Sequence, residues 1–197
     1  MYIVIGTRPT RTLRVLWALE EMGLPYENRS DPPRSAAVRQ QNPSGKVPVL
    51  ICPTDTGPVA LTDSTAILTF LSDRHGQLTN PAGSIARAQQ DSLTQVILDE
   101  CDALLWTAAR HSFILPAEHR LPAIKDSLRW EFGQNLARLA DRLQGPFLMG
   151  AQMTIADIIF AHCLSWAVAA KFPVDPPAMR HYHDRMRARP AYLRASA

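Results

Sequence analysis

Long apolar stretches are missing from this sequence. No run approaches the roughly eighteen consecutive apolar residues that a membrane-spanning helix needs. The opening residues, MYIVIGTRPTR, lack the charged start, apolar run and small-residue cleavage site of a secretory signal. We therefore expect a cytoplasmic protein with no membrane partner.

Cysteine is scarce, and the few that exist are far apart. Cys52, Cys101 and Cys163 form no Cys-x-x-Cys pair, so nothing indicates a disulfide framework or a zinc site. Small buried thiols are the interpretation that fits them. His181 and His183 are two residues apart, a spacing that a helix would direct to different faces. We expect no bound metal.

A block of concentrated positive charge is also absent. The 21 Lys and Arg residues exceed the 18 Asp and Glu residues by only three, and the arginines are scattered among acids without interleaved aromatics. The densest segment, 179–190, has helical spacing and is typical of a solvated face. We expect no nucleic-acid partner, although a mildly basic protein suits small anionic ligands.

Short apolar runs and helical patterns alternate over the first 80 of the 197 residues. Such alternation indicates a βαβ unit, and two closely spaced late strands indicate a hairpin. The predicted order is strand 2–5, helix 12–22, a strand at PYEN, strand 47–51, strand 58–61 and helix 64–75. The first part of the chain is therefore predicted to be a βαβ–ββα module.

The chain reads almost wholly helical from Ser84 onward. The segment 84–111 contains neither Gly nor Pro, and the segment 123–143 has apolar residues at i, i+3 and i+4, so each is predicted to be a helix. Two further predicted helices follow. Gly76 is predicted to end the helix before the linker, and Thr154 with Asp157 to form a capping box. We predict an α/β domain at 1–76, a linker at 77–83 and an all-α helical bundle domain at 84–197.

Three segments occur in one order: NPSGKVPVL before the hairpin, LTDSTAIL entering the helix at 64, and MTIADI in the helical part. Together with the βαβ–ββα pattern, they resemble the cytosolic glutathione transferase family over nearly the whole chain. The resemblance implies a thioredoxin-like domain followed by a helical one, glutathione as co-substrate, conjugation to a small hydrophobic electrophile, a role in detoxification and a homodimer.

The same resemblance assigns a role to the proline that interrupts an apolar run. In this family the equivalent of Pro48 follows a cis peptide bond, and the residue before it, here Val47, offers its backbone to the cysteinyl part of glutathione. A proline that merely starts the strand is the alternative. Lys46, or else Arg39 or Gln40, is expected to reach the glycyl carboxylate, although loop lysines are commonly solvated.

Asp63 and Ser64 are expected to hold the γ-glutamyl end of glutathione. Backbone N–H groups at a helix start suit a carboxylate, Ser64 can add a donor, and Asp63 can pair with the ammonium. The family usually has Glu or Gln in place of Asp63, whose side chain is shorter than either by one methylene. Without the resemblance, Ser64 reads as an N-cap.

The loop after the first strand is expected to activate the thiol. In serine-type relatives a Ser-x-Pro-Cys-Arg stretch follows this strand, and TRPTR aligns with it so that Thr7 replaces the serine and Thr10 the cysteine. We assign the thiolate donor to Thr7 first and Thr10 second. The alternative is that Thr10 or Thr12 only caps a helix and no hydroxyl is catalytic. Arg11 and Arg14 either raise the local positive potential or only flank the helix, and exposed side chains are the commoner case for both.

Trp106, Arg110 and Phe113 lie four and three residues apart, which places them on one helical face. Such a face fits a pocket for an apolar electrophile, and it equally fits bundle core. Two other functions stay open. One is glutathione-dependent isomerisation or peroxide reduction, and the other is a binding or regulatory protein that has the fold without catalysis.

Overall fold

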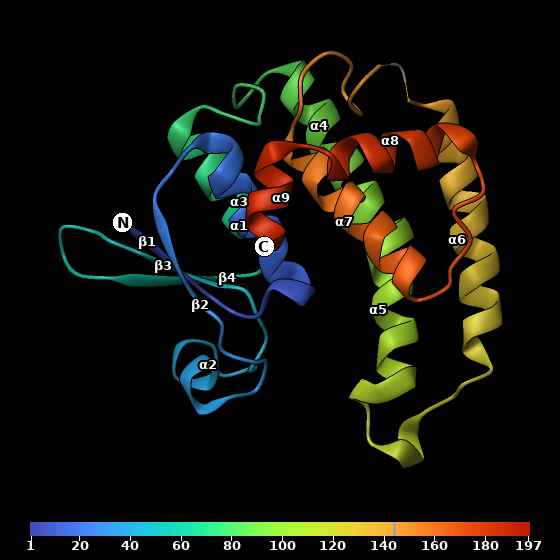
Figure 1. The fold of residues 1–197 in the computed structure, drawn as a ribbon, viewed down its shortest axis with the longest axis horizontal. Helices are drawn as coiled ribbons and strands as arrows, with labels where there is room; N and C mark the ends of the chain where they lie inside the picture. Colours follow the sequence, from blue (N-terminus) through green and yellow to red (C-terminus); the bar gives the residue numbers. More distant parts are fainter. Residues whose placement is uncertain (144) are drawn as a thin grey trace. The chain divides into compact units, whose positions relative to one another are not determined.

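The computed structural model describes residues 1–143 and 145–197, which form two compact units. Unit 1 comprises residues 1–82 together with 187–197, and unit 2 comprises residues 83–186 (Figure 1). Each is described by itself. Within the described ranges, no helix combines the length and apolar content required to cross a membrane.

Unit 1 is built on a four-stranded sheet with strand order β2-β1-β3-β4. β1 runs parallel to β2, whereas β3 is antiparallel to both of its neighbours. This topology confirms the predicted βαβ–ββα module. Its elements are β1 Tyr2–Ile5, the irregular helical turn η1 Arg8–Thr12, α1 Leu13–Met22, β2 Tyr26–Arg29, α2 Ala36–Gln41, β3 Val49–Cys52, β4 Val59–Thr62, α3 Ser64–His75 and α9 Pro190–Ser196.

Helices cover both faces of this sheet, with α1 and α3 on one side and α2 on the other (Figure 1). On the α2 side, Val38 packs with Ile5 and Val49, since alternate strand residues point to the same face. On the other side, α1 buries Leu16 and Trp17 completely. Burying a large apolar side chain contributes about 1.5–3 kcal/mol, so these residues stabilise unit 1.

The C-terminal helix α9 belongs to unit 1, which the sequence did not indicate. Tyr192 meets Trp17 of α1 edge to face, with ring centroids 5.0 Å apart and planes at 79°. Arg189, which precedes α9, pairs with Glu21 of α1. The predicted helical domain 84–197 included this segment, because a helical pattern reveals an element but not the surface that it packs against.

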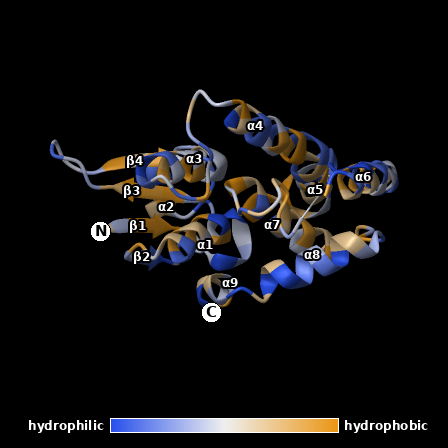
Figure 2. Cartoon of the chain, turned by 90° about the horizontal axis from the view of Figure 1, so that it is seen from above, coloured by the Kyte–Doolittle hydropathy of each residue, from blue (hydrophilic) through white to orange (hydrophobic). Residues whose placement is uncertain are grey.

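The regular elements in the described part of unit 2 are helices, joined by irregular segments that contain one isolated β-bridge between Phe147 and Gly150, and all-α is confirmed for this part. Figure 2 shows α7 as apolar along most of its length and α8 as largely hydrophilic. The predicted helix 84–111 is a run of α-helical and wider π-helical turns that continues to residue 114. The elements are α4 Ile85–Ile97, η2 Leu98–Asp102, α5 Ala103–Ala109, η3 Arg110–Ile114, η4 Ala117–His119, α6 Ile124–Asp141, α7 Ile155–Ala169 and α8 Pro177–Arg187.

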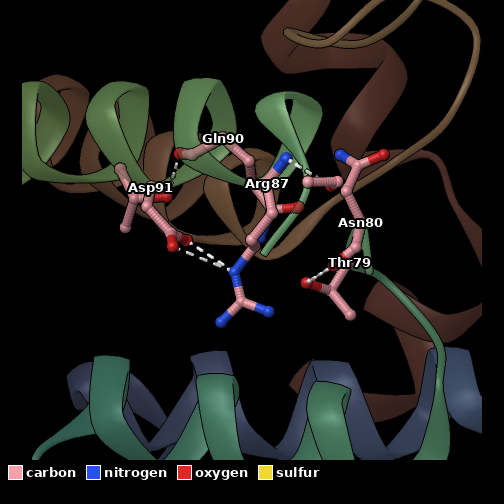
Figure 3. Close-up of polar contacts among 7 residues, drawn as sticks. Thr79, Asn80, Arg87, Gln90 and Asp91 are labelled. Atoms are coloured by element: carbon pink, nitrogen blue, oxygen red, sulfur yellow. Dashed lines mark hydrogen bonds and ion pairs between the residues drawn. The ribbon is translucent and has the colours of Figure 1, made fainter. Parts of the chain in front are cut away.

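Local polar contacts fix where two of these helices begin. Ser84 caps α4, since its Oγ accepts from the Arg87 N–H at 3.1 Å. Figure 3 shows Arg87 beside Asp91, where Arg87 Nε donates to both carboxylate oxygens at 2.9 and 3.0 Å. At the start of α7, Asp157 accepts from the Thr154 N–H at 2.8 Å. The predicted capping box of Thr154 and Asp157 is confirmed.

Candidate functional site

The sheet register of unit 1 aligns the ends of three chain segments. Ile5, the last residue of β1, pairs with Val49, the first residue of β3, and Val49 pairs with Thr62, the last residue of β4. The chain that leaves β1, enters β3 and leaves β4 therefore does so at one end of the sheet. Those flanking segments carry seven of the predicted site residues: Thr7, Thr10, Lys46, Val47, Pro48, Asp63 and Ser64.

Gly6 brings two of these segments into direct contact. Its φ is +140°, a conformation that favours glycine. A Cβ atom at this position would lie 2.2 Å from Thr12 Oγ1 and 2.9 Å from Val47 Cβ. The backbone after β1 can therefore approach Val47 closely only because residue 6 has no side chain.

Two threonines of the loop differ in how their hydroxyls are used. Thr10 Oγ1 donates toward Thr7 O at 2.7 Å or Thr12 Oγ1 at 2.9 Å and accepts from the Thr12 N–H at 3.1 Å. The hydroxyl of half-buried Thr7 forms no hydrogen bond with any residue in 1–143 or 145–197. The loop thus satisfies Thr10 internally and leaves the Thr7 hydroxyl available to a ligand.

Val47 and Pro48 are joined by a cis peptide bond. Pro48 is buried, and Val47 is half-buried on the side of Gly6. Within the described chain, Val47 makes no backbone-to-backbone hydrogen bond, so its N–H and C=O form a short edge that is not used by the sheet. Lys46, just before it, is exposed.

Asp63 rather than Ser64 caps helix α3. Asp63 Oδ1 accepts from the N–H groups of Thr65 at 2.9 Å and Ala66 at 3.1 Å, and its φ is +69°. The interpretation of Ser64 as the N-cap is therefore wrong. Asp63 Oδ2 has no hydrogen-bond partner among the described residues, and the same holds for the N–H of Ser64.

Arg14 was expected to be exposed, and this expectation is wrong. Arg14 is completely buried, and its Nη1 donates to Ser64 Oγ at 3.4 Å, while Ser64 itself is 3% exposed. The β1–α1 segment therefore contacts both other parts of the candidate site, Val47 through Gly6 and Ser64 through Arg14. The sequence signal for Arg14 was weak, because its apolar neighbours at 13, 15 and 16 suited a buried helix but not a buried charge.

The three residues proposed for an electrophile pocket lie in unit 2. Trp106 on α5 is half-buried, whereas Arg110 and Phe113 at η3 are exposed, Phe113 by 67%. Arg110 and Phe113 are therefore not part of the bundle core. In the described residues, no group of three or more His, Cys, Asp and Glu side chains is placed to hold a metal ion, and all three cysteines are buried free thiols, as expected.

Two family models match this chain. The model of the glutathione S-transferase N-terminal domain matches residues 11–74, and that of the glutathione S-transferase C-terminal domain matches residues 122–185. No protein of curated function matches the chain at the sequence level.

Solved structures share the fold over nearly the whole chain. A glutathione transferase from Methylococcus capsulatus str. Bath is 25% identical, with a TM-score of 0.83 over 100% of this chain and 97% of the other. A glutathione transferase family member from Pseudomonas fluorescens Pf-5, with two glutathione bound, is 23% identical, with a TM-score of 0.83 over 99% and 92%. A glutathione transferase homologue from Lodderomyces elongisporus, with two GSH per subunit, is 18% identical, with a TM-score of 0.85 over 99% and 97%.

Proposed function

This chain belongs to the glutathione S-transferase family, and we propose that it conjugates the thiolate of glutathione to small hydrophobic electrophiles. The observation that carries the proposal is the row of paired residues Ile5, Val49 and Thr62 across strands β1, β3 and β4, called the register row below. It gathers a hydroxyl, an unused backbone edge and a helix start at one end of the sheet. These are the three kinds of group that a thiol-bearing tripeptide with two carboxylates and an ammonium requires.

The peptide part of glutathione is assigned to Val47. An extended peptide can add to a strand edge through main-chain hydrogen bonds, and the N–H and C=O of Val47 are not used for this purpose within the described chain. Pro48 has no N–H, which keeps the sheet from extending past this point. The exposed Lys46 is proposed to meet the glycyl carboxylate.

The γ-glutamyl part is assigned to the start of α3. The N–H of Ser64 and the positive end of the helix dipole favour a carboxylate, and the Ser64 hydroxyl proton adds a donor. Asp63 Oδ1 is occupied by the cap, so the ammonium is assigned to Oδ2. Nearby, the buried Arg14 holds Ser64 in place through its side chain.

Thr7 is proposed as the thiolate donor. A free thiol has a pKa near 8.5, so lowering it by two units needs about 2.7 kcal/mol of preference for the anion. A charge-assisted hydrogen bond from the Thr7 hydroxyl can supply much of this. The thiolate then attacks an electrophilic carbon. A C–S bond forms, and either a leaving group departs with its electron pair or the product carbanion takes a proton from solvent.

A matched pair of variants tests this assignment. Thr7→Val and Thr10→Val each remove one hydroxyl at nearly constant volume. We expect Thr7→Val to raise the pKa of bound glutathione, followed by thiolate absorbance, and to lower kcat with an activated aryl chloride about tenfold or more while glutathione affinity changes little. Thr10→Val should affect the fold of the loop more than the thiol pKa. Equal thiol pKa values for wild type and Thr7→Val would remove Thr7 from the mechanism.

A non-catalytic glutathione-binding or regulatory protein is the second candidate. It is favoured by the use of the Asp63 carboxylate as a helix cap, at a position where relatives usually have Glu or Gln. Binding of glutathione with an unshifted thiol pKa would support this candidate over the transferase. Isomerisation and peroxide reduction rank below both, because TRPTR lacks the Ser-Ser-Cys stretch of the related isomerases.

The proposal also covers the location, the oligomeric state and the second substrate of the enzyme. We propose a cytoplasmic homodimer that acts in detoxification, with an apolar electrophile bound near Trp106, Arg110 and Phe113 of unit 2. The exposure of Arg110 and Phe113 supports contact with a ligand rather than with the bundle core. Sedimentation of the protein as a monomer at micromolar concentration would contradict the dimer.

A further inference from the structure

Unit 2 contains a cavity of about 160 Å³. Its walls are formed by α5 and η3, by the first turns of α6, and by the end of α7 with the residues that follow it. Three aromatic rings line it, those of Phe113, Trp166 and Phe172. Two cationic side chains, Lys125 and Arg129, line it as well. The remaining lining is one serine, one leucine and three alanines, so the cavity joins apolar walls to positive charge.

Arg129 is held at the wall of this cavity with unused hydrogen-bonding capacity. Its guanidinium carbon lies 5.8 Å from the ring centroid of Phe172, and its Nε is buried without a hydrogen-bond partner in the described structure. Nη1 contacts Asp126 at 3.4 Å, but that carboxylate is 89% exposed. An exposed pair of this length contributes little, whereas a buried N–H without an acceptor destabilises the folded state.

The second cation adds to this imbalance of charge. Lys125 forms no ion pair with any residue of the described ranges, and Asp126 is the one carboxylate there that pairs with Arg129. Ser112, the lining hydroxyl, donates to Ala108 O at 2.6 Å and so has no proton left for an anion. Anion recognition in the cavity therefore falls to Lys125 and Arg129.

The volume limits the size of the ligand. Clefts for drug-sized molecules measure about 300–1,000 Å³, whereas an engineered apolar cavity of about 150 Å³ holds one benzene. A cavity of about 160 Å³ thus takes a single ring and is too small for a tripeptide. Aromatic walls favour an aromatic ring in offset or edge-to-face contact.

We propose that this cavity of unit 2 binds a single-ring aryl carboxylate. Arg129 and Lys125 hold the carboxylate at one end, and Phe113, Trp166 and Phe172 contact the ring. None of these residues belongs to the glutathione site of unit 1. Phe113 is shared with the proposed electrophile pocket, whereas Trp106 and Arg110 do not line the cavity.

The probe is 4-fluorobenzoate, followed by fluorine NMR on the full chain, with 4-fluorobenzyl alcohol as the neutral ligand of the same ring. We expect saturable binding of the carboxylate, about tenfold weaker in Arg129→Met because that variant loses a charge-assisted hydrogen bond. Lys125→Met should weaken binding severalfold. The matched control is Arg142→Met, which removes the exposed arginine that directly follows the same helix and should leave the affinity unchanged within twofold.

Three results would each overturn the proposal: no saturable binding of 4-fluorobenzoate at millimolar concentration, equal affinity for the alcohol, or equal affinity of Arg129→Met and Arg142→Met. Thermal unfolding checks that Arg129→Met is folded. If it is not, Lys125→Met and the cavity-filling Ala170→Leu decide, since both should weaken binding. Glutathione affinity is measured on the same samples, so failure of this site and failure of the transferase proposal remain separate results.

Discussion

Arg189 donates two hydrogen bonds to the carboxylate of Glu21, from Nε at 2.6 Å and from Nη2 at 2.7 Å. The Glu21 side chain is only 9% exposed and also accepts from Trp17 Nε1 at 2.8 Å. Planar two-point pairs of this kind combine strength with fixed geometry. The pair therefore fastens the C-terminal segment to α1, and so to the unit that carries the proposed glutathione site.

Arg189→Gln is expected to destabilise unit 1 by about 2 kcal/mol, because it leaves a largely buried carboxylate short of its charged donor. Chemical denaturation followed by fluorescence measures the effect. Arg187→Gln is the control, as it removes an exposed arginine two residues away and should change stability by less than about 0.5 kcal/mol. A double-mutant cycle with Glu21→Gln should show coupling. Additive effects of the two changes would contradict the pair.

Gly6→Ala is expected to destabilise the protein by about 3 kcal/mol, because a strained backbone and a steric clash act together. The new Cβ would meet Thr12 Oγ1 at 2.2 Å. Gly76→Ala serves as the control, since Gly76 also has a positive φ, +62°, but nothing lies within 4 Å of a Cβ there. Its cost should be about 1 kcal/mol. Similar melting temperatures for the two variants would show that contact with Thr12 does not matter.

Asp157→Ala is expected to cost more stability than Thr154→Ala, although both disrupt the same capping box. Asp157 accepts from four donors, the N–H groups of Leu148 and Thr154 and the hydroxyls of Thr154 and Tyr182. Loss of Thr154 should cost about 1 kcal/mol. Loss of the Asp157 carboxylate leaves several buried donors without an acceptor and should lower the free energy of unfolding by about 3 kcal/mol or more. Equal unfolding midpoints for the two variants would contradict this account.

Alkaline pH is expected to weaken the contact between β2 and α1. Burial, followed by the hydrogen bond to Glu20, raises the pKa of Tyr26 to about 12. The unfolded chain has a tyrosine pKa near 10, so between about pH 10 and 12 the folded state retains a proton that the unfolded state loses. The stability from Tyr26 is therefore complete below about pH 10 and lost as pH rises through 12. Tyr26→Phe should show a shallower decline than wild type over that range.

The sequence by itself determined the elements and their order. Short apolar runs at 2–5 and 47–51, helical patterns at 12–22 and 123–143, and the cap signals at Gly76 and Thr154 act over a few residues, so they can be read without a fold. The motifs around Pro48 and Ser64 likewise marked the segments that the register row brings to one end of the sheet.

Only the tertiary structure decided which distant residues meet. Contacts between distant segments bury Arg14 against Ser64 and pack α9 on α1. Backbone angles decide that Asp63 caps α3 and that the loop uses the hydroxyl of Thr10 but not that of Thr7. A charged or hydroxyl side chain has the same local sequence signal whether it is solvated or paired, because its partner is chosen by packing.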